Sequence, residues 1–176
     1  MSKKQTTITT SPQTKLTPVD YSALALATVG VGYFKPAPGT WGSAVGVLIY
    51  VAWRQIELSF GNVNTQLALT AVFLWVVSMV GFWASKRAEI ILNEPDPQKV
   101  VIDEVVGQLI TLAFLPLNVS WYWILLGFGL FRLFDIWKPY PIFQIQDLPD
   151  GIGVMIDDII AGFYAGGVLL IILSFV

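Results

Sequence analysis

Five carboxylates stand at the ends of long apolar segments, where an uncompensated charge is costly. Asp103 and Glu104 precede one segment, Asp135 ends another, and Asp157 and Asp158 precede the last. Carboxylates in poorly solvated places repel one another unless a cation lies between them. The chain has no histidine and no cysteine, so a metal would need oxygen ligands, which favour hard cations such as Mg²⁺. We therefore predict that Asp103, Glu104, Asp135, Asp157 and Asp158 bind one or two Mg²⁺ ions.

Two cations accompany Asp135 at regular spacing. Arg132, Asp135 and Lys138 follow one another every three residues, which places them on one side of a helical turn. A structural ladder of ion pairs is one interpretation of this spacing. A metal–phosphate centre is the other, in which Asp135 and Asp158 hold the metal while Arg132 and Lys138 stabilise charge on phosphoryl oxygens. We predict these four residues as catalytic.

A segment rich in glycine and proline, KPAPGTWGS, precedes the first long apolar run. An ordinary turn explains it, and so does a helix N-terminus whose free N–H groups bind an anion. Thr40 or Ser43 would cap such a helix. The predicted substrate-binding residues are Lys35, Gly39, Thr40, Gly42 and Ser43. For Asp103 and Glu104, simple capping of a helix is the alternative to metal binding, and Gln108 would share a helical face with Glu104.

The composition indicates a membrane protein. Hydrophobic residues make up 55% of the 176 residues and charged residues only 12%, against about 25% charge in soluble domains. The predicted fold is all-α, an integral membrane protein with about five spanning helices. The predicted spans are Ser43–Leu58, Leu67–Ala84, Val105–Leu117, Val119–Phe134 and Ile159–Val176. The shorter run Tyr21–Phe34 predicts an interfacial or re-entrant helix.

Lysine and arginine positions predict the orientation. They concentrate before the first predicted span and after the second and fourth, so the N-terminus and these connections should be cytoplasmic. All five carboxylates would then lie on the cytoplasmic face. Residues 1–18 are polar and predict a disordered cytoplasmic tail, and residues 19–176 predict one helical membrane domain. No basic stretch typical of nucleic-acid binding occurs.

Four motifs together resemble the phosphatidylglycerophosphatase A family. They are PGTWGS, IDEVVGQ, FRLFDIWKPYPI and GIGVMIDDIIAG, and the matching blocks extend from about Tyr21 to Gly166. The resemblance implies a Mg²⁺-dependent phosphoric monoester hydrolase of the bacterial inner membrane. Its substrate would be phosphatidylglycerophosphate in the bilayer, and its product phosphatidylglycerol, in phospholipid biosynthesis.

Two other functions fit the same residues. Acids within membrane segments also mark ion pathways, so a small divalent-cation transporter could use the same cluster. A structural subunit with the acids as caps is the third interpretation. If the chain is a phosphatase, the absence of a D-x-D-x-[TV] motif favours direct attack by water over an aspartyl-phosphate intermediate.

Overall fold

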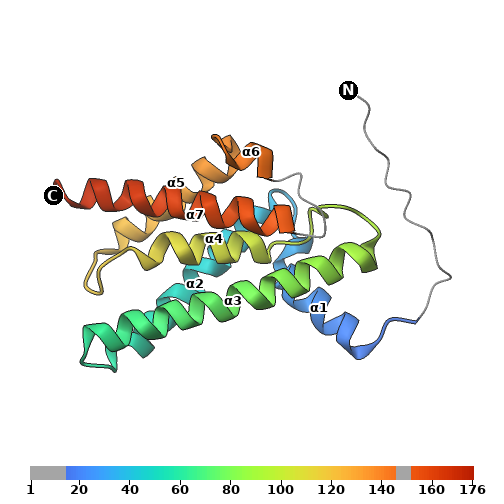
Figure 1. The fold of residues 1–176 in the computed structure, drawn as a ribbon, viewed down its shortest axis with the longest axis horizontal. Coiled ribbons are helices and arrows are strands. Elements are labelled where there is room, and N and C mark those ends of the chain that lie inside the picture. The colour runs from blue at the N-terminus through green and yellow to red at the C-terminus, as the bar shows by residue number, and fades with distance from the viewer. Residues whose placement is uncertain (1–14, 146–151) are drawn as a thin grey trace.

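The protein is a bundle of helices (Figure 1). The computed structural model describes residues 15–145 and 152–176. Its helices are α1 (Pro18–Thr28), η1 (Val31–Tyr33, a 3₁₀ turn), α2 (Pro38–Leu58), α3 (Val63–Leu92), α4 (Ile102–Ala113), α5 (Trp121–Trp137), α6 (Ile142–Ile145) and α7 (Ile152–Leu173). Those two ranges contain no strand, which confirms the all-α prediction. Most of the predicted tail, residues 1–14, lies outside the described residues.

Helix α4 forms the centre of the bundle. Every residue of α4 except Glu104 and Ala113 is buried, because α2, α3, α5 and α7 all pack against it. Small residues allow the closest of these contacts. A Cβ atom on Gly162 of α7 would lie 2.5 Å from the carbonyl oxygen of Gly107, and one on Gly46 of α2 would lie 2.9 Å from the Gln108 Cβ. These glycines therefore hold α7 and α2 against α4.

The helix directions bring three N-termini to one end of the bundle. Gly39 at the start of α2 lies against Glu104 near the start of α4, and Arg54 near the end of α2 donates to the carbonyl oxygen of Leu115, just beyond α4. Helices α2 and α4 are thus parallel. Figure 1 shows α7 running in the same direction as α4, and α3 running in the opposite direction. The end where α2, α4 and α7 begin is called the acidic end below.

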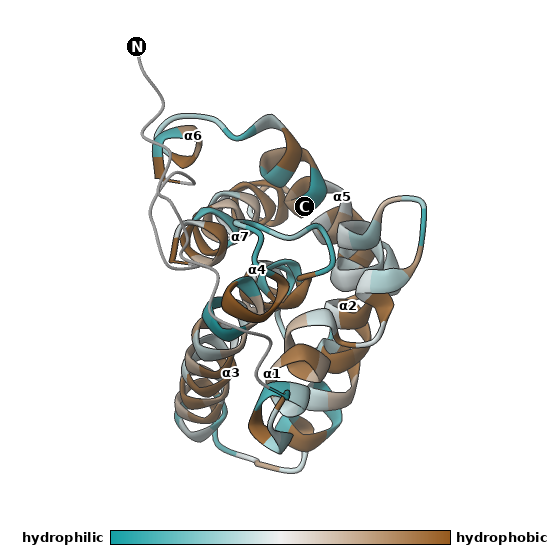
Figure 2. Ribbon diagram, turned by 90° about the vertical axis from the view of Figure 1, so that its right-hand side faces the viewer, coloured by the Kyte–Doolittle hydropathy of each residue, from teal (hydrophilic) through white to brown (hydrophobic). Residues whose placement is uncertain are grey.

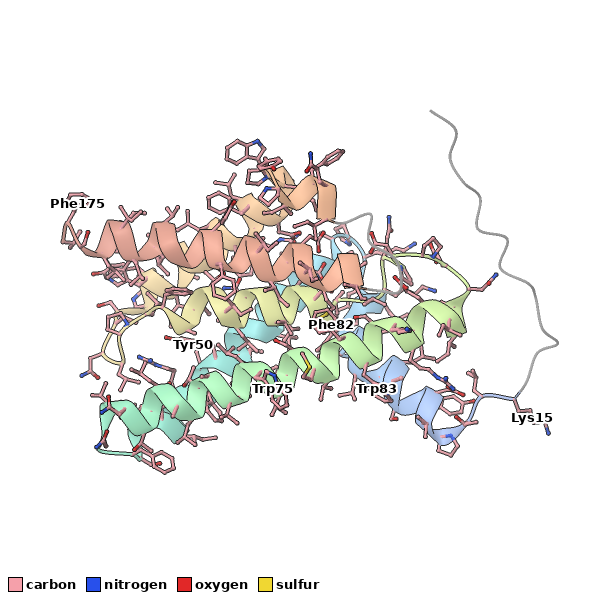
Figure 3. The ribbon with its side chains drawn as sticks, in the orientation of Figure 1. Lys15, Tyr50, Trp75, Phe82, Trp83 and Phe175 are labelled. Atoms are coloured by element: carbon pink, nitrogen blue, oxygen red, sulfur yellow. The ribbon has the colours of Figure 1, made fainter. Side chains whose placement is uncertain are left out.

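Two helices are long and apolar enough to cross a membrane. These are α3, with a mean hydropathy of 2.1 over its most apolar window, and α7, with 1.9. Trp75 is 64% exposed on the outward side of α3 (Figure 3). Figure 2 shows hydrophobic residues along much of the helices and hydrophilic residues in many of the connections. The predicted count of about five spanning helices is not confirmed, since the other described helices do not meet this test.

The predicted interfacial segment, residues 21–34, folds as α1 and the short η1. Thr17 and Asp20 form a capping box at the start of α1, and Asp20 also pairs with Arg87 of α3 at 2.6 Å. The hydrogen bonds from the Thr17 backbone and hydroxyl, followed by that from Arg87, lower the pKa of Asp20 to about 2. This ion pair fastens α1 to the end of α3.

Candidate active site

Three carboxylates meet at the acidic end. Asp103 and Glu104 lie in the first turn of α4, and Asp158 lies near the start of α7. One carboxylate oxygen from each lies within 4.8 Å of the others. Ligands on opposite sides of a Mg²⁺ ion are about 4.2 Å apart, given Mg–O distances of about 2.1 Å. Only small side-chain adjustments would therefore bring the three oxygens around one cation.

The environment of these carboxylates favours a cation. Asp103 and Asp158 are 6% and 4% exposed, and the Asp103 Oδ1 and Glu104 Oε2 atoms are buried without a hydrogen-bond partner among the described residues. A buried anionic oxygen without a partner is strongly unfavourable. The N-terminus of α4 reduces this cost for Asp103 and Glu104 through its dipole, and a hard divalent cation would remove most of the remainder. The donor set therefore fits Mg²⁺ or Mn²⁺.

The other two predicted ligands form ion pairs beside this group. Asp135, in the last turn of α5, lies 2.5 Å from Arg132, and Asp157 lies 2.5 Å from the Lys138 Nζ. Neither aspartate belongs to the three-carboxylate group. Metal binding by Asp135 and Asp157 stays a prediction. In the structure each forms an ion pair with a cationic side chain, Arg132 or Lys138, next to the three-carboxylate group.

Lys138 follows the last residue of α5. Its backbone has a φ of 45° and its N–H donates to Phe134, which ends the helix and turns the side chain towards α7. Burial alone would lower the pKa of the Lys138 amine, but the hydrogen bond and charge of Asp157, with Asp158 and Asp135 nearby, raise the pKa above its ordinary value. The amine is therefore positively charged at neutral pH.

The first turn of α2 lies against Glu104 of the three-carboxylate group. A Cβ atom on Gly39 would be 3.1 Å from the Arg132 Nη1 and the Glu104 Cδ, and closer still to Glu104 Oε1. Gly42, one turn later, lies against Val101 and Glu104. The lack of a side chain at Gly39 thus leaves room for both the carboxylate and the guanidinium.

The remaining predicted substrate-binding residues differ in position. Lys35 is exposed in the segment before α2, and Thr40 is half-buried in its first turn. The prediction that Thr40 or Ser43 caps α2 is wrong. The helix begins at Pro38 after Ala37, which makes no side-chain cap, and the buried Ser43 hydroxyl donates to the Gly39 carbonyl oxygen at 2.9 Å.

Gln108 lies one turn beyond Glu104 on α4. It is fully buried, and both polar atoms of its side chain lack a hydrogen-bond partner among the described residues. Buried polar atoms without a partner are rare and point to a bound ion or water. The sequence indicated Gln108 through its four-residue spacing from Glu104. It did not indicate the pairing of Lys138 with Asp157, because these residues are far apart in the chain and belong to different helices.

The fold and the site define a helical protein with three clustered carboxylates that could hold a metal ion, and with two adjacent cationic side chains. The profile of the family described as phosphatidylglycerophosphatase A matches residues 24–173. The chain belongs to the phosphatidylglycerophosphatase A family. It is accordingly a phosphoric monoester hydrolase of lipid metabolism, and its two apolar helices indicate a membrane protein.

Three relatives are similar over most of their length. The chain is 41% identical over 137 residues to phosphatidylglycerophosphatase A of Haemophilus influenzae, which covers 77% of this chain and 78% of the relative. It is 32% identical over 149 residues to phosphatidylglycerophosphatase A of Escherichia coli, and the match covers 81% of this chain and 78% of the relative. A protein of Bacteroides thetaiotaomicron named putative phosphatidylinositol-3-phosphatase is 38% identical over 137 residues, covering 77% and 83%. No solved structure matches the chain.

Proposed function

We propose that this enzyme hydrolyses the terminal phosphomonoester of phosphatidylglycerophosphate, with Mg²⁺, to give phosphatidylglycerol and phosphate. The observation that carries the proposal is the group of three carboxylates beside the cations Arg132 and Lys138, in which Asp103 and Asp158 are buried and Glu104 is half-buried. The family name supports the substrate. The donor set supports the metal.

In this proposal the three carboxylates hold one Mg²⁺ ion. When bound, the ion would polarise the phosphoryl oxygens and favour attack by water. Gln108 would line the inner side of the site and orient a water through its amide, since its polar atoms are not used by other described residues. A second ion, if present, would draw on Asp135 or Asp157.

The cationic residues would bind the phosphate. Arg132 and Lys138 each have several N–H donors, and Asp135 and Asp157 hold them in position next to the carboxylate group. The N-terminus of α2 would add its dipole, because the helix begins beside Glu104 and Arg132. Lys35, exposed just before α2, would bind the part of the lipid headgroup outside the buried site.

We further propose a multi-pass arrangement in the bacterial inner membrane with the acidic end at the cytoplasmic face. Helices α2, α3, α4 and α5 run alternately in opposite directions (Figure 1), which supports a multi-pass arrangement. Lys99 in the connection between α3 and α4, and Lys138 after α5, both belong to the acidic end, as the positive-inside rule requires of cytoplasmic connections. A phosphate on a lipid headgroup would lie at the same level.

The headgroup is the point on which the relatives' names differ, because one is named a putative phosphatidylinositol-3-phosphatase. No observation favours the divalent-cation transporter.

To distinguish the two headgroups, purified protein should be given phosphatidylglycerophosphate and, separately, phosphatidylinositol 3-phosphate, each with Mg²⁺ or with EDTA. We expect Mg²⁺-dependent phosphate release from phosphatidylglycerophosphate. Equal release with EDTA would contradict the metal site, and faster release from the inositol lipid would contradict the proposed substrate.

A further inference from the structure

A small cavity lies between α2, α3 and α4, towards the end opposite the acidic end. Its volume is about 20 Å³, and the residues around it include Tyr50, Arg54, Glu57, Thr70 and Ala113. A buried water needs about 10–15 Å³ and two to four polar partners. The volume and the lining therefore suit a single water molecule.

Most polar groups around the cavity already have partners within the protein. The Arg54 guanidinium donates to the carbonyl oxygens of Leu115 and Pro116 beyond α4 and pairs with Glu57 at 3.5 Å. Glu57 also accepts a hydrogen bond from the Thr70 hydroxyl of α3. This polar group thus connects α2 with α3 and with the turn between α4 and α5.

The Tyr50 hydroxyl is the exception. Tyr50 is 4% exposed, its ring lies 5.3 Å from the Arg54 guanidinium carbon, and its Oη is buried without a hydrogen-bond partner among the described residues. A buried hydroxyl without a partner is unfavourable because it has lost its bonds to water. Nearly all buried polar groups are bonded to protein or to ordered water, and Tyr50 lines a space of the size a water requires.

We propose that this cavity binds one water molecule, hydrogen-bonded to Tyr50 and to the Arg54–Glu57 pair. The water joins the Tyr50 hydroxyl to the polar group that fastens α2 to α3 and to the end of α4. The cavity is separate from the three-carboxylate group, so the proposal does not depend on the proposed catalytic function. It explains why a tyrosine, and not a phenylalanine, suits the face of α2 that also carries Arg54 and Glu57.

The change Tyr50→Phe tests the proposal, with Tyr33→Phe as control because Tyr33 is 56% exposed. A hydroxyl bonded to water contributes to stability, so Tyr50→Phe should lower the Tm by about 2–4 °C while the control leaves it unchanged. A hydroxyl without a partner costs stability, and its removal would leave the Tm unchanged or raise it. That result would overturn the proposal. Phosphate release should be unchanged in both variants.

A double-mutant cycle adds a test that does not depend on one variant. Ala113→Val would fill the cavity and displace the water. If both changes act on the same water, the fall in Tm for the double variant Tyr50→Phe, Ala113→Val is smaller than the sum for the single variants. Additive falls would mean that valine only crowds its neighbours, and would overturn the proposal.

Discussion

A methyl group at Gly39 is the smallest change that tests the geometry of the site. In Gly39→Ala, the new Cβ would lie 3.1 Å from the Arg132 Nη1 and the Glu104 Cδ, and well under 3.0 Å from Glu104 Oε1. Ordinary van der Waals contact begins at 3.4 Å. The Glu104 carboxylate, a predicted metal ligand, must therefore move away from α2.

The size of the effect follows from that displacement. Restoring an ordinary contact requires the carboxylate to shift by about 1 Å, and a misplacement of this size can reduce a rate about 100-fold. Stability should change little, since the atom that must move is at the end of a side chain and alanine is favoured over glycine within a helix by up to about 1 kcal/mol. We therefore expect kcat/KM to fall about 100-fold with a Tm within about 3 °C of the wild type.

The assay is phosphate release from phosphatidylglycerophosphate at several Mg²⁺ concentrations, with thermal unfolding measured on the same preparations. Gly167→Ala in α7 is the matched control, because a Cβ there would meet nothing within 4 Å. It should keep full activity. Wild-type kcat/KM in Gly39→Ala would refute the placement of α2 against Glu104 and, with it, the account of the site.

Three further predictions concern single side chains. Asp135→Asn and Asp158→Asn should each abolish phosphate release without loss of folded protein, as the circular dichroism spectrum would show, and near-normal turnover would remove that residue from the site. Lys138→Met should lower kcat/KM by about 10²-fold through loss of charge stabilisation of the phosphate, and an unchanged value would exclude that role. Asp20→Asn should make stability less sensitive to acid. The pKa of Asp20 lies at about 2 instead of its ordinary 3.8, so its ionised form stabilises the fold above about pH 4 and this contribution is lost as the pH falls towards 2. Between about pH 4 and pH 2 the Tm of the wild type should fall further than the Tm of Asp20→Asn. Equal falls would contradict the role of the Asp20–Arg87 pair.

The alternation of apolar runs and charged connections predicted most of the helices. Each of the five predicted spans overlaps one long described helix, because apolar runs of this length fold as helices whether lipid or protein covers them. For the same reason the sequence did not separate spanning helices from buried ones. Helix α4 is the clearest case, since its apolar residues face α2, α3, α5 and α7 and not lipid.

The carboxylates of the site were predictable because acids are costly beside apolar segments, whatever their partners. Their pairings were not. Asp157 and Asp158 are neighbours in the sequence, yet Asp158 joins the three-carboxylate group while Asp157 binds Lys138. Successive residues of a helix point about 100° apart, so only the packing of α7 against α4 and α5 decides which aspartate faces which group.

Contacts between residues that are far apart in the sequence were not predicted. Asp20 binds Arg87 from another helix, and Gly39 makes room for Glu104 and Arg132. The sequence predicted Gly39 as a substrate-binding residue, whereas in the structure its lack of a side chain makes room for these two residues. Such a role depends on the neighbouring helix and cannot be derived from the segment PGTWGS alone.

Metal binding tests the central claim most directly. Mn²⁺ is a hard cation that can replace Mg²⁺ at oxygen ligands, and its free concentration can be followed by electron paramagnetic resonance. Titration of the full-length protein in detergent should show saturable binding that Mg²⁺ displaces and that Glu104→Gln weakens strongly, while Gly167→Ala binds as the wild type does. Equal Mn²⁺ binding by the wild type and Glu104→Gln, or no saturable binding by the wild type, would contradict a metal site at Asp103, Glu104 and Asp158.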